Sequence, residues 1–397
     1  MEALKRLEEQ LQSRGVELGF VMEKLENFKI EIPAWAFGNS RTRFALFTQQ
    51  GMPRNPLEKL EDIAAVNRYT GIAPSVALSV ISDCDKDLAA IAQKAKELGL
   101  LIGAINPDFF SDPAYRFGSV CNADPAARQV AYEHMAYSVE IGKKLGSKAQ
   151  SLWIPDGTNY PGQGNFREKR GLLRKFLEDT YRMLPDDTRM FVEYKLYEPA
   201  FYHTDLADWG CSLVLCKDIG ERAQVLVDLG HHAHGVNVEH IVATLLDENK
   251  LGGFHLNSRK SADDDLMTGA INPQELFLIM KELVDGGLCL HTQKTAQNVA
   301  YMIDQSHCIE PKVPAMILSV VNTQIAYCKA LLIDRARLQK AQAENDVITA
   351  SECIREAFET DVAPLLAAFR EQKGLASNPI KAYMASGFEA LRVKNRG

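Results

Sequence analysis

The chain has 397 residues, of which 46% are hydrophobic and 24% are charged, a balance typical of a soluble globular protein. Its formal net charge of −7 argues against the basic face that nucleic-acid binding requires. No stretch reaches the apolar length of a membrane span, and the opening segment lacks the apolar core of a signal peptide. The eight cysteines are scattered without a C-x-x-C pair, so we predict a cytoplasmic protein with no membrane or nucleic-acid partner.

Short apolar runs alternate with longer helical segments along most of the chain. Each run is nearly continuous, as expected of strands buried on both faces of a parallel sheet. In chain order the predicted strands cover residues 30–37, 75–81, 100–106, 151–155, 190–195, 224–230, 252–257 and 301–306. The first strand is the least regular because Pro33 lies inside it. Eight strand–helix alternations predict an α/β fold, a (β/α)8 TIM barrel, with an open doubly wound sheet as the alternative.

After Val313 the pattern changes to long helical segments with no further strand. No repeat, low-complexity tract or flexible linker divides the chain. We therefore predict a barrel over residues 1–312, including an N-terminal helix, and a helical extension over residues 313–397. The extension is expected to contact the barrel or a neighbouring subunit.

Polar side chains end four consecutive predicted strands. They are Glu193 and Lys195, Asp228 and His231, His255 with Asp263 and Asp265 in the loop that follows, and Asp304. In a barrel these strand ends converge on one mouth, where active sites of this fold are built. Buried carboxylates need a nearby positive charge to stay ionised, and divalent cations supply one. Mixed carboxylate and imidazole ligands favour Mn²⁺, Mg²⁺ or Co²⁺ over a cysteine-type zinc site.

Several segments resemble L-rhamnose isomerases, in particular the bacterial branch with broad aldose specificity. They are VEYKLYEPAFYHTDLADWG (192–210), VLVDLGHHAHGVN (225–237), LGGFHLNSRKSADDDL (251–266), MIDQSH (302–307), WIPDGTNYPGQGNF (153–166) and the opening Ile32 to Trp35. The resemblance covers nearly the whole chain. It implies a barrel of the xylose-isomerase type, two divalent cations per subunit and a homotetramer. Mn²⁺ is the first candidate, with Co²⁺, Mg²⁺ and Zn²⁺ as alternatives.

The resemblance also implies roles for individual residues. A structural cation would be held by Glu193, Asp228, His255 and Asp304, and a catalytic cation by His231, Asp263 and Asp265, with Asp228 bridging. Lys195 resembles the lysine that contacts the reacting substrate oxygen, so the predicted catalytic residues are Lys195, Asp304 and Asp228. The predicted substrate-binding residues are Trp153, which resembles an aromatic wall of the sugar site, and Lys195, Asp83, Ser79 and Phe110.

The end of the second strand departs from this family. Its members have a His-x-Pro-Trp-Asp type stretch here, whereas this chain reads LSVISD from Leu78 to Asp83. Ser79 and Ser82 replace the histidine and the tryptophan, and Asp83 persists. We therefore expect an intact metal end and an altered sugar-recognition end. Trp35 and Phe37 are interpreted as core aromatics, because an aromatic near a strand end is more often packed than ligand-contacting.

These observations predict a metal-dependent aldose–ketose isomerase that moves hydrogen between C1 and C2 of a free sugar. The expected substrate is L-rhamnose or a related aldohexose or 6-deoxyhexose. One alternative is a metal-dependent sugar epimerase on the same barrel, which would need Glu193 paired with an acid from strand two. Another is a barrel that binds sugar or metal without turnover. His307 is predicted either to cap strand eight or to bind sugar.

Overall fold

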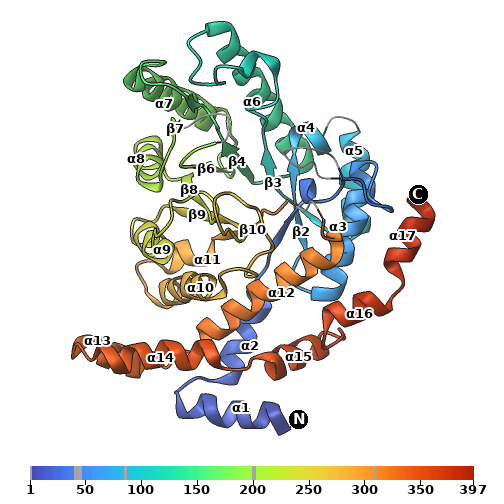
Figure 1. The fold of residues 1–397 in the computed structure, drawn as a ribbon, viewed down its shortest axis with the longest axis vertical. Helices are drawn as coiled ribbons and strands as arrows, with labels where there is room; N and C mark the ends of the chain where they lie inside the picture. Colours follow the sequence, from blue (N-terminus) through green and yellow to red (C-terminus); the bar gives the residue numbers. More distant parts are fainter. Residues whose placement is uncertain (1, 40–46, 85–86, 199–202, 307–308) are drawn as a thin grey trace.

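The computed structural model describes residues 2–39, 47–84, 87–198, 203–306 and 309–397. Eight parallel strands form a closed barrel in the order β1-β10-β9-β8-β6-β4-β3-β2 (Figure 1). Their bounds are β1 Glu31–Pro33, β2 Ser75–Ser79, β3 Leu101–Asn106, β4 Ala149–Trp153, β6 Arg189–Glu193, β8 Ala223–Asp228, β9 Leu251–Leu256 and β10 Ala300–Ile303. All eight predicted strands are present, so the predicted TIM barrel is confirmed.

Strand β1 is shorter than the predicted run because its proline ends the pairing. Glu31, Ile32 and Pro33 align with β2, and the 3-10 turn η1 (Ala34–Ala36) follows at once. Proline has no N–H to donate to the neighbouring strand, so the ladder stops there. The turn carries Trp35 away from the sheet direction and toward the carboxyl ends of the strands.

Eight helices form the outer ring of the barrel. They are α3 Pro56–Thr70, α5 Leu88–Glu97, α6 Pro125–Leu145, α7 Phe166–Met183, α8 Trp209–Ile219, α9 Val238–Asp247, α10 Pro273–Leu288 and α12 Lys312–Leu331. Three of them begin with an Asn or Asp cap followed by proline, which fixes the start of the helix. Helix α12 packs against α10 and α3 and closes the ring. A barrel that includes α12 therefore extends to Leu331, beyond the predicted boundary at residue 312.

Side chains fill the lower part of the barrel interior. Ala77, Ala104, Phe191, Leu226 and Met302 form a buried cluster inside the strands. The carboxylate of Glu31 accepts a hydrogen bond from the N–H of Ala104, a member of this cluster. It occupies the space beside Gly103, where an added Cβ would lie 1.4 Å from Glu31 Oε2, so only glycine fits. The open space of the barrel is left at the carboxyl ends of the strands.

The remaining elements lie at the two ends of the chain or in the loops of the barrel. They are α1 Glu2–Ser13, α2 Leu18–Asn27, α4 Val80–Asp83, η2 Pro113–Tyr115, the antiparallel pair β5 Gly157–Thr158 and β7 His203–Thr204, α11 Gln293–Gln297, α13 Arg335–Ala343, α14 Val347–Glu359, α15 Ala363–Gln372, α16 Pro379–Ala385 and α17 Phe388–Arg396. Among the described residues no single helix is long and apolar enough to cross a membrane. The helices α12 and α13, which are bent relative to each other, meet the length and composition criteria only when they are taken as a pair.

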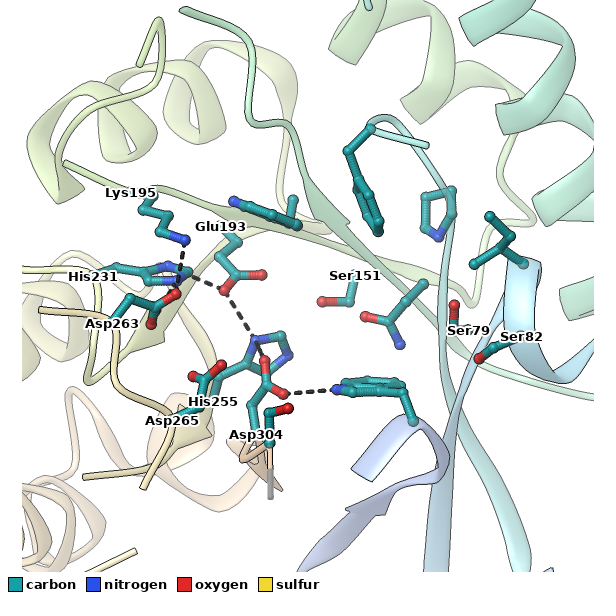
Figure 2. Close-up of a pocket in the computed structure, with 17 residues that line it drawn as sticks. Ser79, Ser82, Ser151, Glu193, Lys195, His231, His255, Asp263, Asp265 and Asp304 are labelled. Carbon is teal, nitrogen blue, oxygen red and sulfur yellow. Dashed lines mark hydrogen bonds and ion pairs between the residues drawn. The ribbon is translucent and has the colours of Figure 1, made fainter. Parts of the chain in front are cut away.

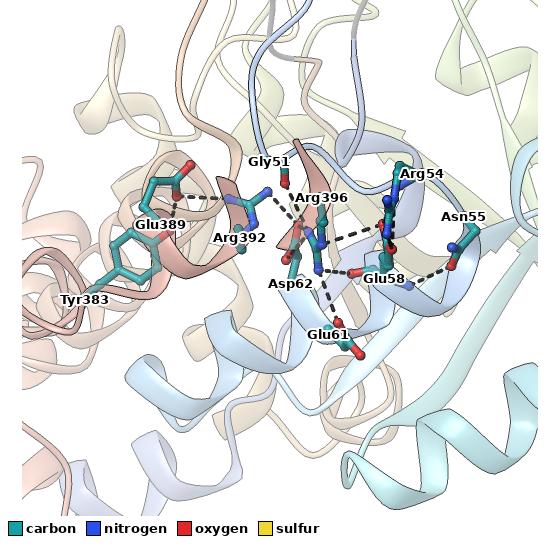
Figure 3. Close-up of polar contacts among 10 residues, drawn as sticks. All are labelled: Gly51, Arg54, Asn55, Glu58, Glu61, Asp62, Tyr383, Glu389, Arg392 and Arg396. Atoms are coloured by element: carbon teal, nitrogen blue, oxygen red, sulfur yellow. Dashed lines mark hydrogen bonds and ion pairs between the residues drawn. The ribbon is translucent and has the colours of Figure 1, made fainter. Parts of the chain in front are cut away.

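The C-terminal helices run along one side of the barrel and return to its first helix (Figure 1). Arg392 and Arg396 of α17 bind the buried carboxylate of Asp62 on α3, at 2.7 and 2.9 Å (Figure 3). The Gly51 N–H also donates to the Gly397 carbonyl at 3.0 Å. The helical extension expected from the sequence is therefore present and is attached to the barrel.

Candidate active site

A cavity of about 410 Å³ opens at the carboxyl ends of the barrel strands (Figure 2). Its volume lies in the range of small-molecule sites. Ten of the predicted site residues line it: Ser79, Phe110, Trp153, Glu193, Lys195, His231, His255, Asp263, Asp265 and Asp304. The other lining residues are Trp35, Ile81, Ser82, Asn106, Pro107, Ser151 and Ser306. The barrel thus brings the residues predicted from the strand ends together with Ser79, Phe110 and Trp153, which the family resemblance indicated.

Carboxylates surround the two imidazoles at one end of the cavity. His255 Nδ1 lies 3.0 Å from Glu193 Oε1 and 3.3 Å from Asp304 Oδ2. His231 Nε2 lies 3.4 Å from Asp263 Oδ1. His231 Nδ1 lies 2.9 Å from the Tyr194 carbonyl oxygen, which can only accept, so this nitrogen carries the proton. Nε2 of His231 is then free to bind a cation.

Asp228 connects two groups of candidate metal ligands. Glu193, Asp228 and His231 bring one ligand atom each within 4.8 Å of one another, and so do Asp228, His255 and Asp304. Asp228 is common to both groups. The four residues expected to hold a structural cation also lie together, because His255 Nδ1 is 3.0 Å from Glu193, 3.7 Å from Asp228 and 3.3 Å from Asp304. Asp228 is 1% exposed, and its Oδ1 accepts from the Gly230 N–H and the Asn257 side chain.

The unpaired atoms of this end fit a bound cation. Asp228 Oδ2 and Asp263 Oδ1 are both buried and form no hydrogen bond with the described residues when His231 Nε2, which lies 3.4 Å from Asp263 Oδ1, carries no proton. Buried carboxylate oxygens normally have a partner, and leaving one without a partner costs several kcal/mol. The donor set consists of carboxylates and imidazoles with no cysteine, which suits a hard or borderline divalent ion.

The electrostatics of the cluster indicate an excess of negative charge. Burial alone would lower the imidazole pKa values, but the surrounding carboxylates raise the pKa of His231 to about 9 and that of His255 to about 10. Burial, together with the charges of Asp263 and Glu193, raises the pKa of Asp228 to about 7. Burial also raises the pKa of Asp265 well above its usual range, helped by nearby Asp263 and Asp304. Without a cation, protons must neutralise these groups.

Lys195 is the one lysine or arginine among the lining residues that the structure describes. Its Nζ binds Asp263 Oδ2 at 2.7 Å and Glu198 Oε2 at 2.6 Å. Burial would lower its pKa, but these two carboxylates raise it, so the ammonium stays charged. The same Nζ lies 4.9 Å from the centre of the Trp153 ring, a cation–π distance. Glu198 was not among the predicted residues, although it follows Lys195 by 3 positions in the sequence.

The other end of the cavity is neutral. Trp153 and Phe110 form an aromatic wall with ring centres 5.1 Å apart, and Phe110 is half exposed at the rim. Figure 2 shows Ser79 and Ser82 on this side, away from the carboxylates, and Ser151 between them and Glu193. The Oγ atom of Ser151 is buried and has no hydrogen-bond partner among the described residues. Neutral hydroxyl groups beside aromatic rings suit the hydroxyl and C–H faces of an uncharged polyol.

Two predictions about individual residues differ from the structure. Asp83 does not line the cavity: its carboxylate is buried, binds Lys59 Nζ at 2.6 Å and accepts from the Ser79 N–H at 2.9 Å. It therefore fixes the short helix after β2. Trp35 is not simply a core residue, because it lines the cavity and its indole N–H donates to Asp304 Oδ1 at 2.8 Å. Phe37 is buried as expected, and His307 lies outside the described residues.

Comparison with known proteins gives the family. No protein-family model matches the chain. A probable sugar isomerase from Rhizobium meliloti (strain 1021) is 43% identical over 98% of this chain and 91% of its own length. The chain belongs to this sugar isomerase family. A second probable sugar isomerase, from Mesorhizobium japonicum, is 42% identical over the same shares. The chain is therefore an isomerase enzyme.

More distant relatives place the family among xylose-isomerase-like sugar isomerases. Xylose isomerase of Thermus thermophilus is 26% identical over 48% of this chain and 51% of its own length. L-rhamnose isomerase of Listeria monocytogenes is also 26% identical, over 64% of this chain and 59% of its own length. The resemblance stated from the sequence is thus confirmed at the level of this wider group and not for L-rhamnose isomerases specifically.

Solved structures support the fold of the family. L-ribulose 3-epimerase aligns with a TM-score of 0.54 at 14% identity, over 81% of this chain and 98% of its own. D-psicose 3-epimerase aligns with a TM-score of 0.51, also at 14% identity, over 77% and 97%. At this identity the likeness concerns the barrel fold alone.

Proposed function

We propose that this chain is a metal-dependent aldose–ketose isomerase of a free sugar, moving hydrogen between C1 and C2. The observation that carries the proposal is the single cavity that combines unpaired metal-type ligand atoms, a charged lysine and a neutral hydroxyl-lined wall. Membership of the sugar isomerase family supports it.

The carboxylate end would hold two divalent cations, with Asp228 common to both. Mn²⁺ is the first candidate, and Co²⁺, Mg²⁺ and Zn²⁺ are alternatives, because the donors are carboxylates and imidazoles. When bound, the cations would polarise substrate oxygens and stabilise the negative charge that develops there. The ligands proposed are Glu193, Asp228, His231, His255, Asp263, Asp265 and Asp304.

The protein's own groups would position and protonate the sugar. Lys195, held charged by Asp263 and Glu198, would donate to the reacting oxygen near C1. Trp153 and Phe110 would pack against the C–H face of the open chain. Hydroxyl groups of Ser79 and Ser151 would bond to sugar hydroxyls farther along the chain.

A free sugar fits this cavity better than a phosphorylated one. A phosphate group needs arginine, several lysines or clustered backbone N–H groups. Among the described lining residues no arginine is present and Lys195 is the one lysine, and two carboxylates already bind it. The proposed substrate is L-rhamnose or a related aldohexose or 6-deoxyhexose. A cytoplasmic location and a homotetrameric assembly remain predictions from the sequence.

The epimerase alternative, as posed from the sequence, required Glu193 to pair with an acid from strand two. That acid is Asp83, which is buried against Lys59 and does not line the cavity. The alternative of a barrel without turnover is disfavoured because both candidate ligand groups are complete. Isomerisation is therefore the function that we favour.

Proton NMR of aldoses and ketoses in D₂O tests the proposal. Protein stripped with a chelator and then given Mn²⁺ should interconvert an aldose and its ketose, and the stripped protein should not. Conversion of a ketose into its C3 epimer, with no aldose formed, would establish the epimerase instead. No change in any sugar, with Mn²⁺ bound, would leave the binding barrel as the function.

A further inference from the structure

A buried arginine in the helical extension has no carboxylate partner among the described residues. Arg370 on α15 is 4% exposed. Its Nη2 donates to Gln324 Oε1 on α12 at 2.5 Å, and its Nη1 donates to the Ser377 carbonyl at 3.3 Å. Neither partner carries charge. Burying a guanidinium without a counter-charge is costly, so a buried arginine is normally paired.

Two donors in this place have no acceptor in the part of the chain that the structure describes. They are Arg370 Nε and the Nε2 atom of Gln324, and both are buried. Exchanging the oxygen and nitrogen of the Gln324 amide does not give these donors an acceptor, because the amide oxygen already accepts a hydrogen bond from Arg370. Two neighbouring unpaired donors beside an uncompensated cation indicate an acceptor that is negatively charged.

The guanidinium lies in the wall of a second cavity, of about 630 Å³, between α12, α15 and α16. This cavity shares no lining residue with the active-site cavity. Two more cations, Lys329 and Lys381, line it. Two carboxylates also line it: Glu359 binds Arg355, whereas Asp361 accepts from the Ala363 N–H and its charge acts on Lys329.

We propose that this cavity binds a small oxyanion, a phosphate or carboxylate group, on the Arg370 guanidinium. The free Nε–H and an unused N–H of the same guanidinium can receive two oxygens side by side, as in arginine–phosphate pairs. Lys329 and Lys381 add positive charge around the bound group. A bound anion joins α12 of the barrel to α15 and α16 of the extension, so it stabilises the attachment of the extension.

Thermal unfolding of the full chain tests the site, with inorganic phosphate and malonate as probes at constant ionic strength. The unfolding temperature of the unmodified protein should rise with phosphate or malonate concentration, because only the native state holds the site. In Arg370→Met this rise should be lost. Without added anion, Arg370→Met should unfold at the same or a higher temperature, because an uncompensated buried charge is removed.

Arg337→Met, an exposed arginine of α13 whose partner Glu356 does not line the cavity, is the matched control and should keep the full response. Arg370→Lys keeps the positive charge but loses the paired N–H donors of the guanidinium, so its affinity for phosphate should fall at least tenfold. This variant replaces Arg370→Met in the test if the methionine variant does not fold. A larger rise in unfolding temperature with phosphate than with malonate indicates a phosphate ligand, and the reverse indicates a carboxylate ligand. An equal rise in unmodified and Arg370 variants, or no rise with either anion, would overturn the proposal. None of these readouts depends on sugar turnover.

Discussion

At the scale of single residues, Trp35 connects the start of the barrel to its last strand. Its indole N–H binds Asp304 Oδ1, which leaves Oδ2 facing His255. Trp35→Phe keeps the aromatic ring but removes this hydrogen bond. We expect a Mn²⁺ affinity about 10- to 100-fold weaker, the usual cost of losing a group that orients a metal ligand. Calorimetric titration of stripped protein with Mn²⁺ measures it. Trp209→Phe, on α8 outside the cavity, should bind as the unmodified protein does.

Ser151 gives a test that separates recognition from stability. Its buried Oγ has no partner among the described residues, whereas the Oγ of Ser138 donates to Gln150 Oε1 at 2.7 Å. Ser151→Ala should leave the free energy of unfolding unchanged or higher and raise KM for the sugar about tenfold, as expected for one lost hydrogen bond. Ser138→Ala should lower stability by about 1–3 kcal/mol with KM unchanged. Equal KM values for Ser151→Ala and unmodified protein would remove the serine from the sugar site.

The sequence predicted the charged residues of the cavity and, through the family resemblance, the neutral Ser79, Phe110 and Trp153, but it did not predict Ser151 or Asn106. A carboxylate or histidine at the end of a buried strand is conspicuous, because burial there is costly without a partner. Ser151 and Asn106 carry no such signal, since serine and asparagine are common in any loop or strand. Trp35 was missed because its role depends on the turn after Pro33, which brings the ring to Asp304. The alternation of Ser151 with Trp153 on β4 could have found the serine.

At the scale of elements, the contact between α17 and α3 rests on one buried carboxylate. Asp62 is fully buried, and the side chains of Arg392 and Arg396 are almost so (Figure 3). Asp62→Asn would remove the buried charge that both arginines share and leave them only their more exposed partners, Glu389 for Arg392 and Glu58 and Glu61 for Arg396. The free energy of unfolding should therefore fall by about 3–5 kcal/mol. Urea denaturation measures the loss. Arg355→Met, which breaks an exposed pair in α14, should change it by less than about 0.5 kcal/mol. If Asp62→Asn lowered the free energy of unfolding by less than about 1 kcal/mol, the contact between α17 and α3 would contribute little to stability.

The strands and ring helices were predictable because each buries an apolar face with a regular period. The pair β5 and β7 was not, because each strand has two residues and no period can be seen in so short a segment. The boundary before α12 was placed by the end of the last strand. That criterion cannot tell the last helix of the ring from the first helix of an extension, since both are amphipathic and both are buried.

At the scale of the whole molecule, metal binding and proton release are coupled. In metal-free protein at pH 7 both imidazoles are protonated, because their pKa values are about 9 and 10. A histidine binds a metal only when neutral and a carboxyl group only when ionised, so Mn²⁺ should displace at least two protons per chain, and affinity should rise from pH 6 toward 9. Calorimetry in buffers of different ionisation enthalpy counts these protons. Binding heats independent of the buffer would contradict the protonated state.

The same shifts set the pH dependence of the metal-free fold. Both imidazoles have pKa values raised above the unfolded value of about 6.5. Their contribution to stability is therefore complete below about pH 6.5 and is lost as the pH rises through 9 and 10. Alkaline conditions should thus weaken the stripped protein while they favour the metal-bound one.

The contact between α17 and α3 also bears on how the protein is made. Asp62 and Arg392 are 330 positions apart, so the ribosome presents α3 long before its partner helix exists. Contacts of such long range form late, because the intervening chain must first be closed into a loop. Until then Asp62 remains a carboxylate whose burial is not compensated. A chain cut short before α17 would keep that defect permanently, and its barrel would open more easily to the proteases that remove incomplete products.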